Sequence, residues 1–147
     1  MKRFLLVFLA FGMVSFGDSP SVSNSTNATL NPNIWHGLYI YYYNQAKELS
    51  KKEHKPVLLY FYGNDCTYCD LFDQYVLQKP DVVDFINRHF VFSSVNVDEA
   101  GGHKFIREFR LFGTPAFAVI YPDGHFKVYQ GYKTKEQFLY ILSKLAR

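Results

Sequence analysis

The chain has 147 residues, the length of one ordinary domain, and 48% of them are hydrophobic. With 15 Phe and 12 Tyr, this composition supplies a packed core and excludes an intrinsically disordered chain. Setting aside Lys2 and Arg3 of the predicted leader leaves 14 basic residues against 13 acidic ones. The charge therefore does not favour nucleic acid or an anionic membrane as a partner.

The first 17 residues have the three parts of a secretory signal sequence. Lys2 and Arg3 form a charged start, residues 4–14 are apolar, and Ser15 and Gly17 place small residues where cleavage requires them. The apolar stretch is shorter than the roughly 20 residues that span a membrane. We therefore predict a cleavable signal sequence over residues 1–17 and an exported protein, with an uncleaved membrane anchor as the alternative.

The folded part is expected to begin after a polar segment. Residues 18–33 are rich in Ser, Asn, Thr and Pro, so we interpret them as a flexible linker, followed by one domain over residues 34–147. Composition predicts a helix over residues 43–52, and the aromatic residues at 39–43 are expected to pack it against the sheet. The continuous apolar run over residues 57–62 predicts a central strand covered on both faces.

The middle of the chain continues this alternation of helices and strands. We expect residues 66–77 to be helical, Pro80 to open the next helix, and residues 90–97 to form a second strand. Phe105, Phe109 and Phe112 recur at the spacing of one helix face, which predicts a helix that Gly113 ends.

The last third predicts a hairpin and a helix. Residues 116–121 and 125–130 are expected to be antiparallel strands joined by a turn at Pro122-Asp123-Gly124. Thr134 and Gln137 have the pattern of a capping box that opens a final helix. The order of elements favours an α/β fold, with a mostly parallel sheet covered on both faces and one antiparallel hairpin.

The two cysteines form a Cys-x-x-Cys pair, Cys66 and Cys69, between a predicted strand and a predicted helix. The N-terminus of a helix stabilises a thiolate and lowers a cysteine pKa from about 8.5 to between about 3.5 and 7.5. Cys66 is therefore the candidate nucleophile, and Cys69, one turn later, is the candidate resolving cysteine that breaks the mixed disulfide. A bridge across so short a loop adds little stability, so the spacing favours redox chemistry over a structural role.

The stretch from Lys55 to Cys69 resembles the thioredoxin superfamily, and it is most similar to exported members and to the periplasmic thioredoxin domain of transmembrane thiol:disulfide interchange reductases. The resemblance continues through Asn96–Asp98, Phe112–Pro115 and Tyr121–Gly124, and covers roughly residues 34–147. It implies a thioredoxin fold, with a mixed four-stranded sheet flanked by helices and an extra N-terminal helix. It also implies a redox-active disulfide and no cofactor.

The resemblance implies further site residues. Pro115 is expected to follow a cis peptide bond and to face the cysteines, and the backbone of Thr114 is expected to pair with a bound substrate chain. Thr67 and Tyr68, between the cysteines, complete the expected substrate-binding residues. The five histidines show no paired spacing, so no metal site is expected, with zinc bound by the two cysteines as the alternative.

The sequence departs from the family in its proton acceptor. The buried acid that the family places six residues before the first cysteine is replaced by Tyr60, and a family lysine in the next strand by Ser94. A tyrosine cannot accept a proton near neutral pH, so water or another group must do so. Asp65 and Asp70 flank the cysteines and oppose the effect of the helix N-terminus on the thiol pKa, which favours a reductant.

These features predict a periplasmic protein-disulfide reductase that acts as a monomer on client proteins with disulfides. A membrane thiol-disulfide electron donor would recharge it, and no nucleic-acid partner is expected. A disulfide oxidase or isomerase is the alternative within the same chemistry. A thioredoxin-fold binding module whose cysteines are only structural is the alternative from another class.

Overall fold

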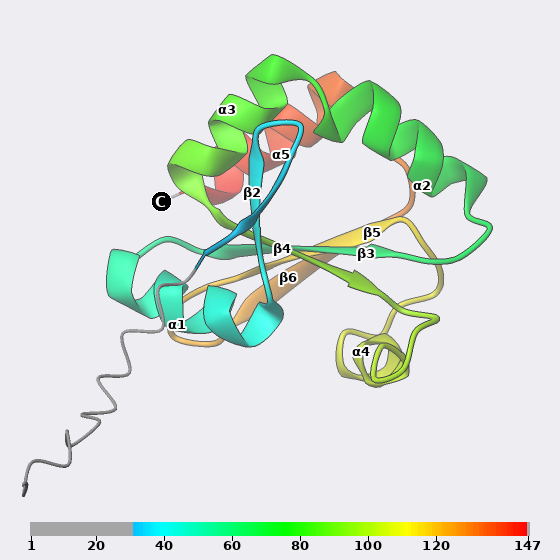
Figure 1. The fold of residues 1–147 in the computed structure, drawn as a ribbon, viewed down its shortest axis with the longest axis horizontal. Coiled ribbons are helices and arrows are strands. Elements are labelled where there is room, and N and C mark those ends of the chain that lie inside the picture. The colour runs from blue at the N-terminus through cyan, green and yellow to red at the C-terminus, as the bar shows by residue number, and fades with distance from the viewer. Residues whose placement is uncertain (1–30, 147) are drawn as a thin grey trace, which may run out of the picture.

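The computed structural model describes residues 31–146, so the predicted signal sequence and most of the predicted linker lie outside the described residues. Its elements follow in the order β1 (Asn33–Trp35), β2 (Leu38–Tyr41), α1 (Tyr43–Glu53), β3 (Val57–Tyr62), α2 (Thr67–Phe72), η1 (Asp73–Leu77), α3 (Pro80–His89), β4 (Val91–Asn96), α4 (His103–Glu108), β5 (Ala116–Ile120), β6 (Phe126–Gln130) and α5 (Lys135–Leu145). One mixed sheet runs through the middle of the domain (Figure 1). The α/β class expected from the sequence is confirmed.

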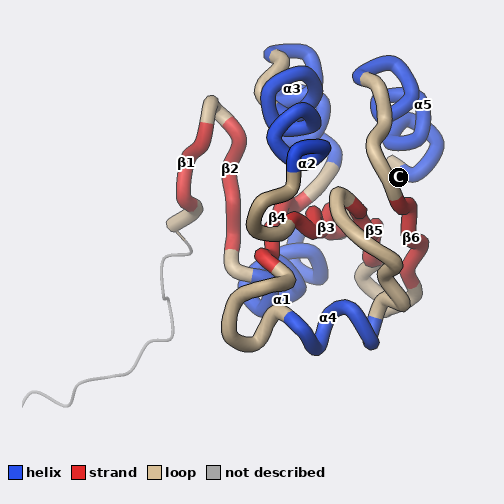
Figure 2. The backbone as a smooth tube through the Cα atoms, turned by 90° about the vertical axis from the view of Figure 1, so that its right-hand side faces the viewer, coloured by secondary structure: helices blue, strands red, loops and turns tan. Residues whose placement is uncertain are grey.

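The sheet separates two layers of helices. Figure 2 shows α2, α3 and α5 on one face and α1 and α4 on the other. The central strand β3 alternates between the two, because successive side chains of a strand point to opposite faces. Leu58 and Tyr60 belong to the core under α2, α3 and α5, whereas Leu59 and Phe61 belong to the core with Phe105 of α4.

The sheet has six strands in the order β1-β2-β4-β3-β5-β6, so the four expected strands, β4, β3, β5 and β6, are present and two more extend the sheet. The two additional strands form an N-terminal hairpin, in which His36 and Gly37 take positive φ angles of 48° and 84°. Two such residues build the tight turns that suit antiparallel strands. Strand β2 then pairs in parallel with β4, Ile40 lying opposite Phe92. Asn33, which was expected in the linker, is the first residue of β1.

The tyrosines at positions 39–43 differ in part from the expectation that they pack the first helix against the sheet, because some of them belong to the N-terminal hairpin. Tyr39 and Tyr42 are 46% and 74% exposed, so these two side chains do not pack the first helix against the sheet. Tyr41 of β2 and Tyr43 are partly buried and pack against the core that includes Ala46 of α1, and the Tyr43 ring centroid lies 5.4 Å from that of Phe105. Helix α1 itself covers nearly the predicted residues.

Helix α4 is shorter than predicted, because it ends at Glu108. Arg110 takes a left-handed φ of 51° and reverses the chain, after which Leu111 rather than Phe112 enters the core. Phe112 is 94% exposed, so the prediction that it continues a buried helix face was wrong. The side chain of Gln130 holds this loop, since it accepts from the Phe112 N–H at 2.6 Å and donates to the Arg110 carbonyl at 3.2 Å.

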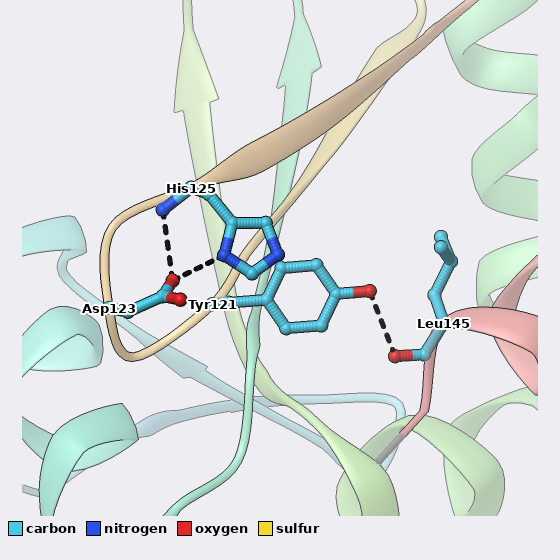
Figure 3. Close-up of polar contacts among 4 residues, drawn as sticks. All are labelled: Tyr121, Asp123, His125 and Leu145. Carbon is cyan, nitrogen blue, oxygen red and sulfur yellow. Dashed lines mark hydrogen bonds and ion pairs between the residues drawn. The ribbon is translucent and has the colours of Figure 1, made fainter.

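The C-terminal hairpin and helix agree with the sequence. Thr134 and Gln137 form the predicted capping box at the start of α5. In the turn between β5 and β6, Asp123 pairs with the His125 ring, and that ring stacks on Tyr121 at a centroid distance of 4.2 Å (Figure 3). The Tyr121 hydroxyl donates to the Leu145 carbonyl at 3.3 Å, so this turn is tied to the end of α5.

Candidate active site

The two cysteines lie at the start of helix α2, after the loop that follows β3. They form a disulfide with their Cα atoms 5.2 Å apart. Cys66 is the N-cap residue of α2, and its Sγ accepts the Cys69 N–H at 3.2 Å. An N-terminal position and a backbone N–H donor both favour negative charge on this sulfur. Cys66 is partly exposed and Cys69 is only 3% exposed, so Cys66 is the more accessible of the two.

The loop before Cys66 is held by residues that follow the neighbouring strand β4. Asp98 accepts from the Asn64 N–H at 2.7 Å, and Asn96 donates to the Asn64 side chain at 2.9 Å. These contacts arise because β3 and β4 are parallel, so their carboxyl ends meet at one edge of the sheet. Asn96 and Asp98 therefore position the loop before Cys66, a role that their spacing alone did not reveal.

The segment before β5 also lies next to Cys66. The Thr114–Pro115 peptide bond is cis. The Thr114 hydroxyl donates to Cys66 Sγ at 3.3 Å, and the Thr114 carbonyl oxygen lies 3.5 Å from the same sulfur. Residues 48 positions apart in the chain are thus neighbours at the reactive atom.

Two hollows flank Thr114. One, of about 250 Å³, is lined by Tyr68, Thr114, Pro115, Gly131 and Tyr132. The other, of about 220 Å³, has Val97, Leu111, Phe112 and Thr114 among its lining residues. Tyr68 and Phe112 are 63% and 94% exposed, so aromatic side chains stand at the rims of both hollows. Thr67 is exposed at the start of α2 and lines neither hollow.

Comparison with known proteins agrees with this geometry. The family model described as a thioredoxin-like domain matches residues 43–146. The chain belongs to this family. A solved thioredoxin from Thermus thermophilus shares 30% identity at a TM-score of 0.68, covering 74% of this chain and 87% of that one. The C-terminal domain of DsbD from Neisseria meningitidis, in its reduced form, shares 27% identity at a TM-score of 0.58, covering 69% of this chain and 91% of that one.

A longer relative is also named DsbD. The thiol:disulfide interchange protein DsbD of Haemophilus ducreyi is 26% identical over 149 residues, which cover 96% of this chain and 26% of that protein. This chain therefore spans about a quarter of that relative's length. Together with the Cys66–Cys69 disulfide, these similarities support thiol-disulfide oxidoreductase chemistry for the thioredoxin-like domain.

Tyr60, which is buried, and Asp73, which is half-buried, are neighbouring titratable residues beneath this thioredoxin-like site. Burial, and then the nearby Asp73 carboxylate, raise the pKa of Tyr60 well above its usual value near 10, so this side chain does not replace the missing acid. Burial is also the main reason why the pKa of Asp73 is raised above its ordinary 3.8. Asp73 follows Cys69 by one helical turn, a spacing that sequence reasoning could have used but did not.

The remaining expectations concern metals and membranes. Within residues 31–146, no group of three His, Cys, Asp or Glu side chains is placed to hold a metal ion. No helix in the same part of the chain is both long enough and apolar enough to cross a membrane.

Proposed function

We propose that this protein is an exported protein-disulfide reductase in which Cys66 is the nucleophile and Cys69 the resolving cysteine. The observation that carries the proposal is the unequal exposure of the two sulfurs beside Thr114: one is accessible and the other is buried. In the reduced protein, the Cys66 thiolate attacks one sulfur of a client disulfide, and the other client sulfur leaves as a thiolate and takes a proton. Cys69 loses its proton and attacks Cys66 Sγ, which releases the second client thiol and closes the Cys66–Cys69 disulfide.

The charges near the motif support reduction over oxidation. A strong oxidant is one whose reduced form is stabilised, as happens when a cation holds the thiolate. Here Asp65 and Asp70 stand on either side of the cysteines, and both are exposed. Their negative charge disfavours the thiolate that the helix N-terminus and the Cys69 N–H favour. The reduced form is therefore less stabilised than in an oxidant, and the pair gives its electrons to the client.

The surface around Cys66 supports client proteins as substrates. Tyr68 and Phe112 expose aromatic rings at the rims of the two hollows beside Thr114. We infer that Thr114 and Pro115 bind an extended client segment whose apolar side chains enter these hollows, with Thr67 and Tyr68 beside them. Residues 1–17 support export. We infer that the protein acts as a monomer in the periplasm, where a membrane thiol-disulfide donor would return the electrons.

The reduction potential of the Cys66–Cys69 pair tests the direction of electron flow. Equilibration of the purified protein against glutathione or dithiothreitol is expected to give a value near about −270 mV, as for thioredoxin. A value near about −120 mV would make the protein an oxidant. Cys69→Ala is expected to accumulate a mixed disulfide with reducible clients, and Cys66→Ala is expected to form none. A folded protein that reduces no disulfide, such as those of insulin, would instead be a binding module.

A further inference from the structure

A cavity of about 260 Å³, whose lining includes neither cysteine, lies between the N-terminal hairpin, strands β3 and β4, and η1. Aromatic side chains make up half of its lining, namely Trp35, Tyr60, Tyr62 and Phe92. Its volume is a little below the roughly 300–1,000 Å³ of typical ligand pockets, so it suits a small molecule. The extra strand β1 contributes to it through Trp35.

The polar groups in this cavity are unusual for so apolar a place. Tyr60 is only 4% exposed, and its hydroxyl makes no well-formed hydrogen bond among residues 31–146, although the Asp73 carboxylate lies close enough to interact with it. Asp73 Oδ1 is buried and likewise makes no well-formed hydrogen bond in this part of the chain, so both oxygens keep hydrogen-bonding capacity that their mutual interaction does not fill. Because unfilled hydrogen-bonding capacity of buried polar groups costs stability, each one is a site where a ligand gains a hydrogen bond that the protein does not supply.

The charge of the cavity selects the kind of ligand. Asp73 is the one formally charged residue among those that line it, and no basic residue in the described chain does so. Asp70 adds negative charge near Asp73, and Glu99 adds negative charge near Tyr62. An anion is therefore repelled. A bare metal ion needs several ligands, and the described residues offer no such group here.

We propose that this cavity binds a small alkylammonium ion, whose N–H groups donate to Asp73 Oδ1 and to the Tyr60 hydroxyl while its alkyl part lies among the aromatic side chains. Cations are attracted to the faces of Trp and Tyr rings, and an ammonium ion gains a charge-assisted hydrogen bond from a carboxylate. The ligand class follows from three features together: negative charge, buried oxygens with unfilled hydrogen-bonding capacity, and aromatic walls. This site is separate from the disulfide exchange proposed above.

The chain offers its own reporter for this proposal. Trp35 is the only tryptophan in the sequence, and it lines the cavity, so its fluorescence reports on what enters. The oxidised protein is titrated at a pH of about 8, where carboxylates are charged. The probes are isopentylammonium and its neutral counterpart isopentanol, at constant ionic strength. Isopentylammonium is expected to change the Trp35 emission with a dissociation constant on the order of 1 mM, and isopentanol to bind at least about tenfold more weakly.

Variants separate the cavity from general charge effects. Asp73→Asn is expected to weaken isopentylammonium binding at least about tenfold, and Tyr60→Phe about threefold or more. Asp84→Asn, which removes an exposed carboxylate paired with Arg88, is the matched control and is expected to leave binding unchanged. Circular dichroism shows that each variant is folded. Equal affinity for the ammonium ion and the alcohol, unchanged binding in both cavity variants, or no response of Trp35 would each overturn the proposal.

Discussion

At the scale of a single residue, Asp73 is notable for its position. It directly follows helix α2, whose N-cap is Cys66, and one of its carboxylate oxygens is buried. Its Oδ1 atom is buried beside Tyr60, and burial raises its pKa. The sequence places Tyr60 where the family has an acid, but it does not show that a second acid lies beside that position. Asp73 is the residue at which α2 ends and the π-helical turn η1 begins.

The raised pKa of Asp73 predicts how stability depends on pH. The folded protein holds this proton at pH values where the unfolded chain, with an ordinary pKa near 3.8, has released it. The contribution of Asp73 to the free energy of unfolding therefore falls as pH rises through this window. We expect Asp73→Asn to change the free energy of unfolding, relative to the natural protein, more favourably at a pH of about 7 than at a pH of about 3.5.

Urea unfolding of oxidised protein across this pH range measures the difference. Asp84→Asn serves as the control for the overall change in charge, because Asp84 is exposed and pairs with Arg88 at 3.0 Å. If the free energies of unfolding of Asp73→Asn and the natural protein differed by the same amount at every pH, the pKa of Asp73 would not be raised in the folded protein.

At the scale of elements, the junction between β4 and α4 explains how the loop before Cys66 is held. Gly102 precedes α4 and packs against the backbone that leaves β4, so that an added Cβ would lie 2.1 Å from the Asn96 carbonyl oxygen and 2.9 Å from Val97 Cα. Asn96 in turn donates to Asn64, next to the cysteines. A glycine at this point therefore lets the chain turn tightly enough to bring Asn96 and Asp98 to the site.

We expect Gly102→Ala to lower the free energy of unfolding by about 1–3 kcal/mol, because the neighbours of the new methyl group are backbone atoms that cannot move aside easily. Gly113→Ala is the matched control, since an added Cβ there meets nothing within 4 Å, and it is expected to stay within about 0.5 kcal/mol of the natural protein. Chemical denaturation measures both. Equal stabilities of the two variants would show that the β4–α4 junction tolerates a side chain.

At the scale of the whole molecule, the central strand β3 is buried and paired on both sides, whereas the edge strand β1 is short. Strand β3 pairs with β4 on one side and β5 on the other, and its side chains Leu58, Leu59 and Phe61 are fully buried. Strand β1 has three residues, two of them exposed, and pairs only with β2 within residues 31–146. Strand β1, which contributes Trp35 to the cavity, is therefore held less firmly than the central strands.

Amide hydrogen exchange is expected to show this difference. The amides of β3 should exchange only on global unfolding, whereas those of β1 should exchange at least about a hundredfold faster through local opening of the hairpin. Mass spectrometry of exchanged peptides resolves the two segments. Equal protection of β1 and β3 would mean that the hairpin is part of the same cooperative unit as the central strands.

The sequence alone determined the features that depend on neighbouring residues. The apolar run of β3, the start of α3 at Pro80, the capping box at Thr134 and the Cys66–Cys69 pair all follow from local composition and spacing, and the structure has each of them. The resemblance to the thioredoxin superfamily extended this to the fold as a whole. These predictions succeeded because a strand run, a cap or a dithiol motif is defined within a few residues.

Only the tertiary structure decided the features that join distant segments. The parallel pairing of β2 with β4, the contact of Thr114 with Cys66, and the cavity shared by Trp35, Tyr60 and Asp73 each bring together residues far apart in the chain. The end of α4 belongs with them, because Arg110 reverses the chain so that Leu111 can enter the core and Gln130 can hold the loop. Such contacts depend on how whole elements pack, and helical spacing alone cannot show which of two adjacent apolar residues the core will accept.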